Sequence, residues 1–235
     1  MGLFPEGSHL QRAFVVLVAL ALLFSLARLI RTSLGAAKVR RDARAVYFDR
    51  AIAGLTAVRR RIEPTGFPRI ACLRNGISYD LQVVPDTLTF RKLPALWVLV
   101  TQTEPLPLKA TMDLMMRPTL LEPFSQFRDL PHEIAVPPGL PADCALRCDD
   151  PAHLLAEGLL ARHAGMFADP CVKELILSPR GLRLVFLAEE AERTRYLLFR
   201  DAEMGGQPLA LQRLEPMLAA LERLREDVLN LKVAG

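Results

Sequence analysis

The chain has 235 residues, of which 51% are hydrophobic and 24% charged, and its formal net charge is +4. This composition excludes a disordered chain, and the length is enough for one domain with a sizeable core. The basic charge is confined to residues 28–61, which hold ten cations against two carboxylates, so residues 62–235 carry a net charge of −4. We therefore expect no nucleic-acid partner, because binding one would require basic residues on the folded domain.

An apolar run over residues 13–30 is the first predicted element. Its sequence, AFVVLVALALLFSLARLI, contains one charged residue, Arg28. With a rise of ~1.5 Å per residue, a helix of this length spans roughly 27 Å, which matches the hydrocarbon core of a bilayer. We predict a transmembrane helix over residues 13–33, behind a short extracytoplasmic tail at residues 1–12. A cleaved signal peptide is the alternative, although the run is long for one and its start is not basic.

The cations that follow the apolar run predict its orientation. Because positive charge tends to remain cytoplasmic, we expect the amino terminus outside and the large domain in the cytoplasm, at a bacterial inner membrane. An exported, periplasmic domain is the alternative. Anionic lipid headgroups attract such a segment by ~1 kcal/mol for each nearby cation. The residues expected at the membrane surface are Arg28, Arg31, Lys38, Arg40, Arg41 and Arg44.

Residues 34–63 are expected to form a basic, helical juxtamembrane stem. Apolar residues recur at spacings of three and four from Val39 through Tyr47 and Leu55 to Ile62, which predicts an amphipathic helix over residues 38–62. This helix is expected either to pack on its own domain or to lie on the membrane or a partner. Residues 64–235 then form the soluble domain.

Short β-strands are predicted from residue 69 onward, each bounded by turn signals. The predicted ranges are 69–73, 78–84, 87–92, 95–101 and 108–116, with turns at Asn75-Gly76 and Pro85-Asp86. Residues 95–101, ALWVLVT, are apolar on both faces, which favours a central position in the sheet.

A long proline-rich loop is predicted over residues 117–141, because so many prolines are incompatible with a regular sheet. Loops of this length are often functional, and this one carries several large apolar residues. We expect it to form a docking surface for a membrane partner, through Leu120, Leu121, Phe124 and Phe127. The alternative is that the loop packs over the edge of its own core.

The rest of the chain predicts a strand over residues 143–148, a helix capped by Asp150, a hairpin over residues 173–187, a strand over residues 194–200 and a terminal helix over residues 208–231. The terminal helix has apolar residues at heptad spacing, so it either packs on the sheet or forms a seam with a partner. The fold class is therefore α+β. It combines an N-terminal transmembrane helix and helical stem with a mainly antiparallel sheet and two packed helices, the second C-terminal.

The sequence contains no recognisable catalytic, metal or cofactor motif, so we expect neither an enzyme nor a bound cofactor. The four histidines, His9, His132, His153 and His163, fall in four separate contexts. Cys144 and Cys148 are expected on one face of a straight strand about 13 Å apart, too far for a disulfide or a shared zinc ion. We interpret them as core residues.

These features predict an accessory, assembly or scaffold protein with one membrane span. Such a protein presents a cytoplasmic α+β domain to a larger membrane complex or to a second copy of itself. The alternative hypothesis is a membrane-tethered enzyme, or a domain that binds a lipid or a small molecule.

Overall fold

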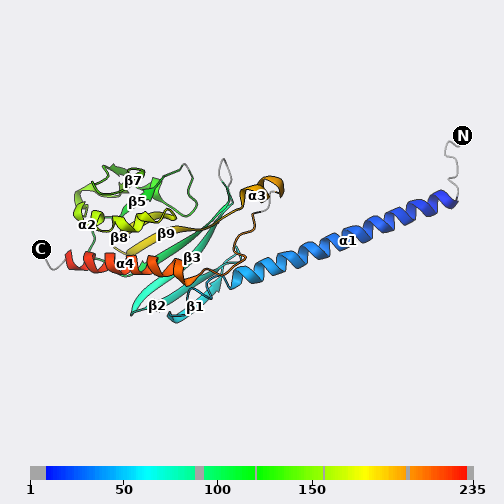
Figure 1. The fold of residues 1–235 in the computed structure, drawn as a ribbon, viewed down its shortest axis with the longest axis horizontal. Coiled ribbons are helices and arrows are strands. Elements are labelled where there is room, and N and C mark those ends of the chain that lie inside the picture. Colours follow the sequence, from blue (N-terminus) through cyan, green and yellow to red (C-terminus); the bar gives the residue numbers. More distant parts are fainter. Residues whose placement is uncertain (1–8, 88–92, 120, 156, 200–201, 232–235) are drawn as a thin grey trace. The chain divides into compact units, whose positions relative to one another are not determined.

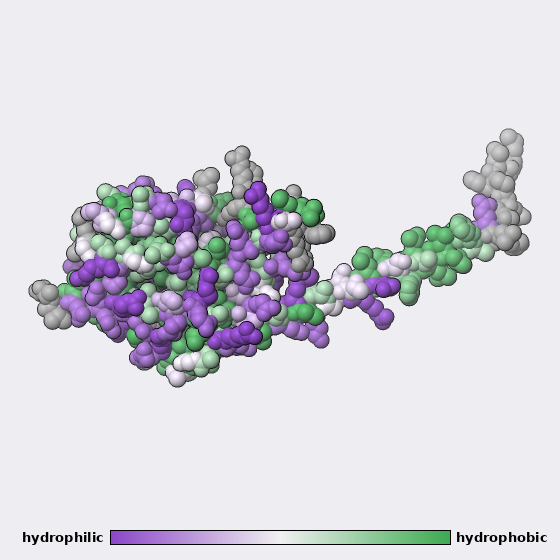
Figure 2. All heavy atoms as spheres, viewed as in Figure 1, coloured by the Kyte–Doolittle hydropathy of each residue, from purple (hydrophilic) through white to green (hydrophobic). Residues whose placement is uncertain are grey.

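The computed structural model describes residues 9–87, 93–119, 121–155, 157–199 and 202–231. The chain divides into two compact units, residues 1–42 and residues 43–235. The first unit is formed by most of helix α1 (His9–Ala45), which is a single helix of 37 residues (Figure 1). Residues Gln11–Ala45 are long and apolar enough to cross a membrane, and the apolar stretch is not buried by the rest of the protein. Hydrophobic residues surround the visible side of this stretch (Figure 2).

The stem differs from its prediction. A helix was predicted over residues 38–62, but helix α1 ends at Ala45. A series of turns follows, and Thr56–Ile62 then form strand β1. Two physical causes explain the change. Thr56, Val58 and Ile62 are β-branched residues, which favour strands. Backbone pairing with the next strand is also available to them, from Thr56 opposite Leu73 to Ile62 opposite Pro68.

The second unit is built on an antiparallel sheet of nine described strands in the order β1-β2-β3-β4-β9-β8-β5-β7-β6 (Figure 1). The other strands are β2 (Pro68–Arg74), β3 (Ile77–Asp86), β4 (Ala95–Thr103), β5 (Met112–Met116), β6 (His132–Ile134), β7 (Cys144–Cys148), β8 (Val172–Ser178) and β9 (Gly181–Glu190). The predicted central strand is confirmed, because β4 lies between β3 and β9 and pairs with both.

Both predicted hairpins are present in the sheet. Strands β2 and β3 meet at Asn75 and Gly76, whose φ angles are 52° and 79°. This left-handed pair suits the tight turns of hairpins. Strands β8 and β9 are joined through Pro179 and Arg180. Of the strand predicted over residues 87–92, residues 88–92 lie outside the described part of the chain.

The first face of the sheet is covered by the terminal helix α4 (Leu211–Leu231), which contacts β9 and β4 (Figure 1). Its heptad positions are occupied by buried residues that join the main hydrophobic cluster. These are Leu214, Met217, Leu221, Leu224 and Val228. The apolar stripe is therefore used inside the domain, as in the alternative in which the helix packs on the sheet.

The shorter helices depart from the predictions. Asp150 caps the chain as expected, because its side chain accepts a hydrogen bond from the N–H of Ala152. However, only a 3-10 turn (Pro151–His153) follows directly, and helix α2 (Glu157–Arg162) comes after a break. Further 3-10 turns occupy Phe127–Asp129 and Ala164–Ala168.

The strand predicted over residues 194–200 is wrong, because Arg193–Phe199 form helix α3. The preceding strand, β9, already has β4 on one side and β8 on the other. A strand that followed directly would therefore find no free edge beside β9. Leucine and arginine are also good helix formers, so the segment adopts a short helix instead.

Candidate functional site

The second face of the sheet has its own small core, under the proline-rich loop. Leu99, Met115 and Val185 are buried there together with Phe124 and Phe127 from the loop. The rings of Trp97 and Phe124 lie with their centroids 4.7 Å apart. The loop of residues 117–141, which we call the lid, therefore covers this part of the sheet with its aromatic side chains.

This arrangement bears on the predicted docking residues. Phe124 and Phe127 are only 7% and 8% exposed, so their side chains are used within the domain. Leu121 is 69% exposed, while Leu120 lies outside the described residues.

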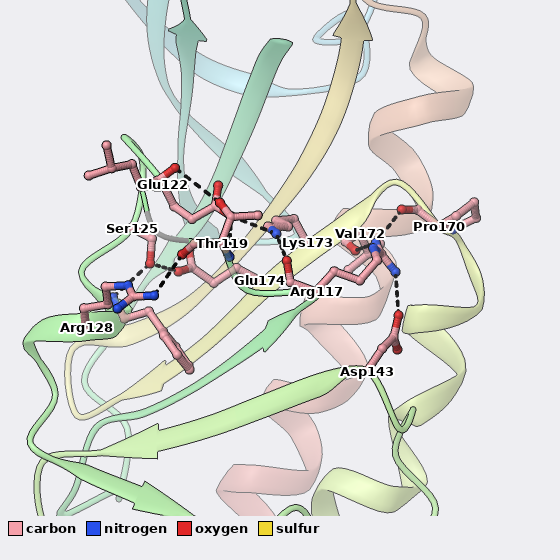
Figure 3. A network of polar contacts seen from close by, with 12 residues as sticks. Arg117, Thr119, Glu122, Ser125, Arg128, Asp143, Pro170, Val172, Lys173 and Glu174 are labelled. Carbon is pink, nitrogen blue, oxygen red and sulfur yellow. Dashed lines mark hydrogen bonds and ion pairs between the residues drawn. The ribbon is translucent and has the colours of Figure 1, made fainter. Parts of the chain in front are cut away.

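A buried ion pair fastens the loop to strand β8. The ammonium group of Lys173 lies 2.9 Å from Glu122 Oε1, and it donates a hydrogen bond of 2.6 Å to the carbonyl oxygen of Arg117 (Figure 3). Arg117 in turn donates to the carbonyl oxygen of Pro170 at 2.8 Å. Figure 3 shows the side chain of Lys173 pointing toward Glu122 and the carbonyl oxygen of Arg117. The start of the loop is thus held to the sheet at several points.

Next to this ion pair, Ser125 connects the loop to a pair of acidic residues in the sheet. Its hydroxyl donates a hydrogen bond to Glu174 Oε1 and accepts one from the N–H of Phe127 at 2.9 Å. Glu174 faces Asp113 of strand β5, and both residues are almost completely buried. We call Asp113 and Glu174 the carboxyl pair.

The surroundings of the carboxyl pair raise the pKa values of both of its groups. Burial, the charge of Glu174 and a hydrogen bond with it raise the pKa of Asp113 to about 9. Burial raises the pKa of Glu174 to about 7, against the opposing effects of Ser125, Asp113 and Arg183. Asp113 Oδ1 and Glu174 Oε2 are buried without a hydrogen-bond donor, which a proton shared by the two carboxyls would supply. Two carboxyls this close cannot both ionise at low cost.

Carboxyl groups that titrate near neutrality are capable of acid–base chemistry. Here, however, Asp113 and Glu174 are covered by the lid and lie 1% and 0% exposed, so no substrate reaches them in this conformation. Within the described ranges, no group of three or more His, Cys, Asp or Glu side chains is placed to hold a metal ion. Neither residue of the pair was predicted as a site residue. The available signal was one acidic residue inside each of two apolar strands, MDLMM and VKELILS.

The lid leaves one part of the second sheet face open. This open part is a groove of about 700 Å³. The groove is lined by the ends of β4, β8 and β9, by the turn between β8 and β9, and by the segments next to β5 and β7. Most of its polar groups belong to Thr101, Thr103, Thr111, Ser178, Arg180 and Arg183. A smaller pocket of about 130 Å³ lies at the lid itself and includes Leu121 and Ser125.

The remaining predicted residues are the cations expected at the membrane surface. Of the cations expected at the membrane surface, Arg28, Arg31, Lys38, Arg40 and Arg41 are exposed along the first unit. Arg44 is half-buried in the second unit, where its guanidinium lies 5.2 Å from the centre of the Phe67 ring.

The cysteines are free thiols, and two of the histidines pair with aspartates. Cys72 and Cys148 are buried free thiols, as expected of core residues, and Cys144 and Cys171 are half-buried free thiols. His153 pairs with Asp150 at 2.7 Å, and His163 on the turn after α2 pairs with Asp227 of α4 at 3.0 Å. Nothing brings these histidines to the carboxyl pair or to the groove.

Comparison of the chain with protein-family models, with curated proteins and with solved structures finds no match.

Proposed function

We propose that this protein is a single-pass membrane protein that presents its α+β domain, on the cytoplasmic side, to a partner within a membrane complex. The observation that carries the proposal is the exposed, apolar helix over Gln11–Ala45. An apolar surface of this length is costly in water and is satisfied by a bilayer. The cations directly after the apolar run support the proposed orientation.

A scaffold or accessory role is favoured over catalysis by the second sheet face. The acid–base groups on this face are closed under a lid that is fastened by a buried ion pair. What the lid offers to a partner is the exposed side chain of Leu121 beside a small pocket. We propose this point of the lid as the centre of the docking surface.

The proposal is tested by site-specific photocrosslinking in native membranes. A photoreactive amino acid replaces Leu121 in one variant and Leu198 of helix α3 in the control variant. The control is well matched, since these two leucines are 69% and 70% exposed. We expect a discrete adduct at position 121 that is missing at position 198, with the mass of one partner protein or of a second copy of this chain. Equal labelling at both positions, or lipid adducts alone at position 121, would contradict the proposed docking surface.

A further inference from the structure

The groove is the uncovered continuation of the sheet face that the lid protects. Along β4, the residues on this face run from Trp97 and Leu99, under the lid, to Thr101 and Thr103 in the groove. The face thus changes from apolar to hydroxyl-rich where the cover ends. An antiparallel sheet commonly has one solvated face, so hydroxyl groups alone would not indicate a ligand.

Arg183 gives the groove a specific chemical character. Its Nε donates a hydrogen bond of 3.0 Å to Thr101 Oγ1, which holds the guanidinium against the sheet. In the part of the chain that is described, Arg183 forms no ion pair within 4.0 Å, although it is half-buried. Its positive charge acts on the buried carboxyl pair, but among the described residues its guanidinium is held by Thr101 and not by a paired carboxylate. A guanidinium held in this way offers its remaining N–H groups as a bidentate donor.

The other charged groups of the groove leave it an excess of positive charge. Arg180, at the turn between β8 and β9, is exposed and makes no side-chain ion pair among the described residues. Asp149 is the one carboxylate in the lining, and its Oδ1 is already used as the acceptor for the N–H of Thr111 at 2.8 Å. The groove lining therefore contains two arginines and a single carboxylate, which is engaged locally.

We propose that the groove binds the oxyanion group of a small polar molecule, a phosphate or a carboxylate, with Arg183 as the anchoring residue. Arg180 adds a second positive charge at the rim, and Thr103 and Thr111 provide hydroxyl groups for the rest of the ligand. The site is independent of the docking surface at Leu121, so the two proposals can fail separately.

The first test is calorimetric titration of the full-length protein in nanodiscs of zwitterionic lipid. The probe is inorganic phosphate, with succinate as the carboxylate arm and sodium chloride at equal ionic strength as the control. We expect saturable binding of phosphate or succinate that sodium chloride does not reproduce. Arg183→Gln should weaken binding at least tenfold and Arg183→Lys less, because lysine keeps the charge but loses the fork geometry. If neither oxyanion binds more than chloride does, the proposal is wrong.

Matched variants separate the groove from general charge effects. Arg128→Gln removes an exposed arginine from the lid, outside the groove lining, and should leave the affinity unchanged. Arg180→Gln should weaken binding by about threefold. If Arg183→Gln does not fold, Arg180→Gln is the variant that tests whether the groove binds the oxyanion. Unchanged affinity in both groove variants would overturn the proposal. Glycerol 3-phosphate in solution and phosphatidate in the nanodisc then distinguish a soluble ligand from a lipid headgroup, since the preferred source should displace phosphate.

Discussion

Lys173 and Glu122 face each other at 2.9 Å with side chains that are each only 7% exposed. This contact joins strand β8 to the lid. Among the described ion pairs between the lid and the sheet, it is the most deeply buried. A pair of this kind adds little net stability over a well-packed apolar pair, but the loss of one partner leaves a buried charge without compensation. The lid is therefore sensitive to single substitutions at either residue.

Lys173→Met should lower the free energy of unfolding by about 3–5 kcal/mol, because Glu122 would remain buried as an unpaired carboxylate. The double variant Lys173→Met/Glu122→Leu should recover most of this loss. Urea unfolding of the purified full-length protein, followed by tryptophan fluorescence, measures both effects. Arg61→Gln is the surface control, since Arg61 is 72% exposed in its pair with Glu63 and its loss should cost less than about 1 kcal/mol. A double variant as unstable as the single one would contradict this account.

The aromatic side chains of the lid should be required for stability. Phe124→Ala is expected to lower the free energy of unfolding by about 3 kcal/mol, because it removes a buried ring that packs on Trp97. Leu121→Ala, in the same loop but at an exposed position, should change it by less than about 0.5 kcal/mol. Thermal and urea unfolding compare the two. Similar stabilities for both variants would show that the lid does not pack as described.

The carboxyl pair should make the protein less stable as the pH rises. Folding raises the pKa of Asp113 to about 9 and of Glu174 to about 7, so the folded protein keeps protons that the unfolded chain releases above about pH 4. Stability from this source is complete below the unfolded pKa values and is lost as the pH rises through 7 to 9.

Asp113→Asn tests this pH dependence, because its amide can donate to Glu174 without a titrating proton. The variant should flatten the decline in stability between pH 6 and pH 9, and at pH 9 it should be more stable than the wild type. Asp129→Asn, at an exposed position on the lid, is the control and should keep the wild-type slope. An unchanged slope in Asp113→Asn would show that the pair does not hold the shared proton.

Gly181 at the start of β9 should tolerate no side chain. Its φ angle is 137°, and a Cβ atom there would lie 2.0 Å from the carbonyl oxygen of Gln102. Gly181→Ala is therefore expected to disrupt the pairing of β9 with β4 and to lower the free energy of unfolding by about 2 kcal/mol or more. Gly206→Ala is the control, because no atom lies within 4 Å of its added Cβ and the change should be nearly neutral. The two midpoints of thermal unfolding give the comparison.

Periodicity predicted the parts of the fold whose burial is regular. The two-sided apolar run of β4 and the apolar stripe of α4 are both confirmed by their positions at the sheet and its covered face. Local patterns failed where tertiary pairing decides the structure. Residues 56–62 fit a helical stripe, yet they pair as an edge strand with β2. A strand was predicted over residues 194–200, yet the neighbours of β9 leave no edge for one and Arg193–Phe199 form α3.

The candidate sites were harder to predict than the fold. Asp113, Glu174 and Ser125 are separated widely along the chain, and only the register of β5 with β8 and the path of the lid bring them together. The groove depends likewise on which part of the sheet face Phe124 and Phe127 of the lid cover, and no local motif shows this. Phe124 was predicted to contact a partner and packs on its own sheet beside Trp97, because an apolar side chain cannot by itself indicate which of these surfaces it covers.

The most direct test of the proposed function is the topology of the full-length chain in a bacterial membrane. Green fluorescent protein and alkaline phosphatase are fused in turn after Gly235, and the membranes are washed with alkaline carbonate. The account predicts that the protein stays in the membrane pellet at its full mass, with a fluorescent reporter and an inactive phosphatase. An active phosphatase with a dark fluorescent reporter, or a soluble product shortened by cleavage near residues 25–27, would contradict a retained anchor with a cytoplasmic domain.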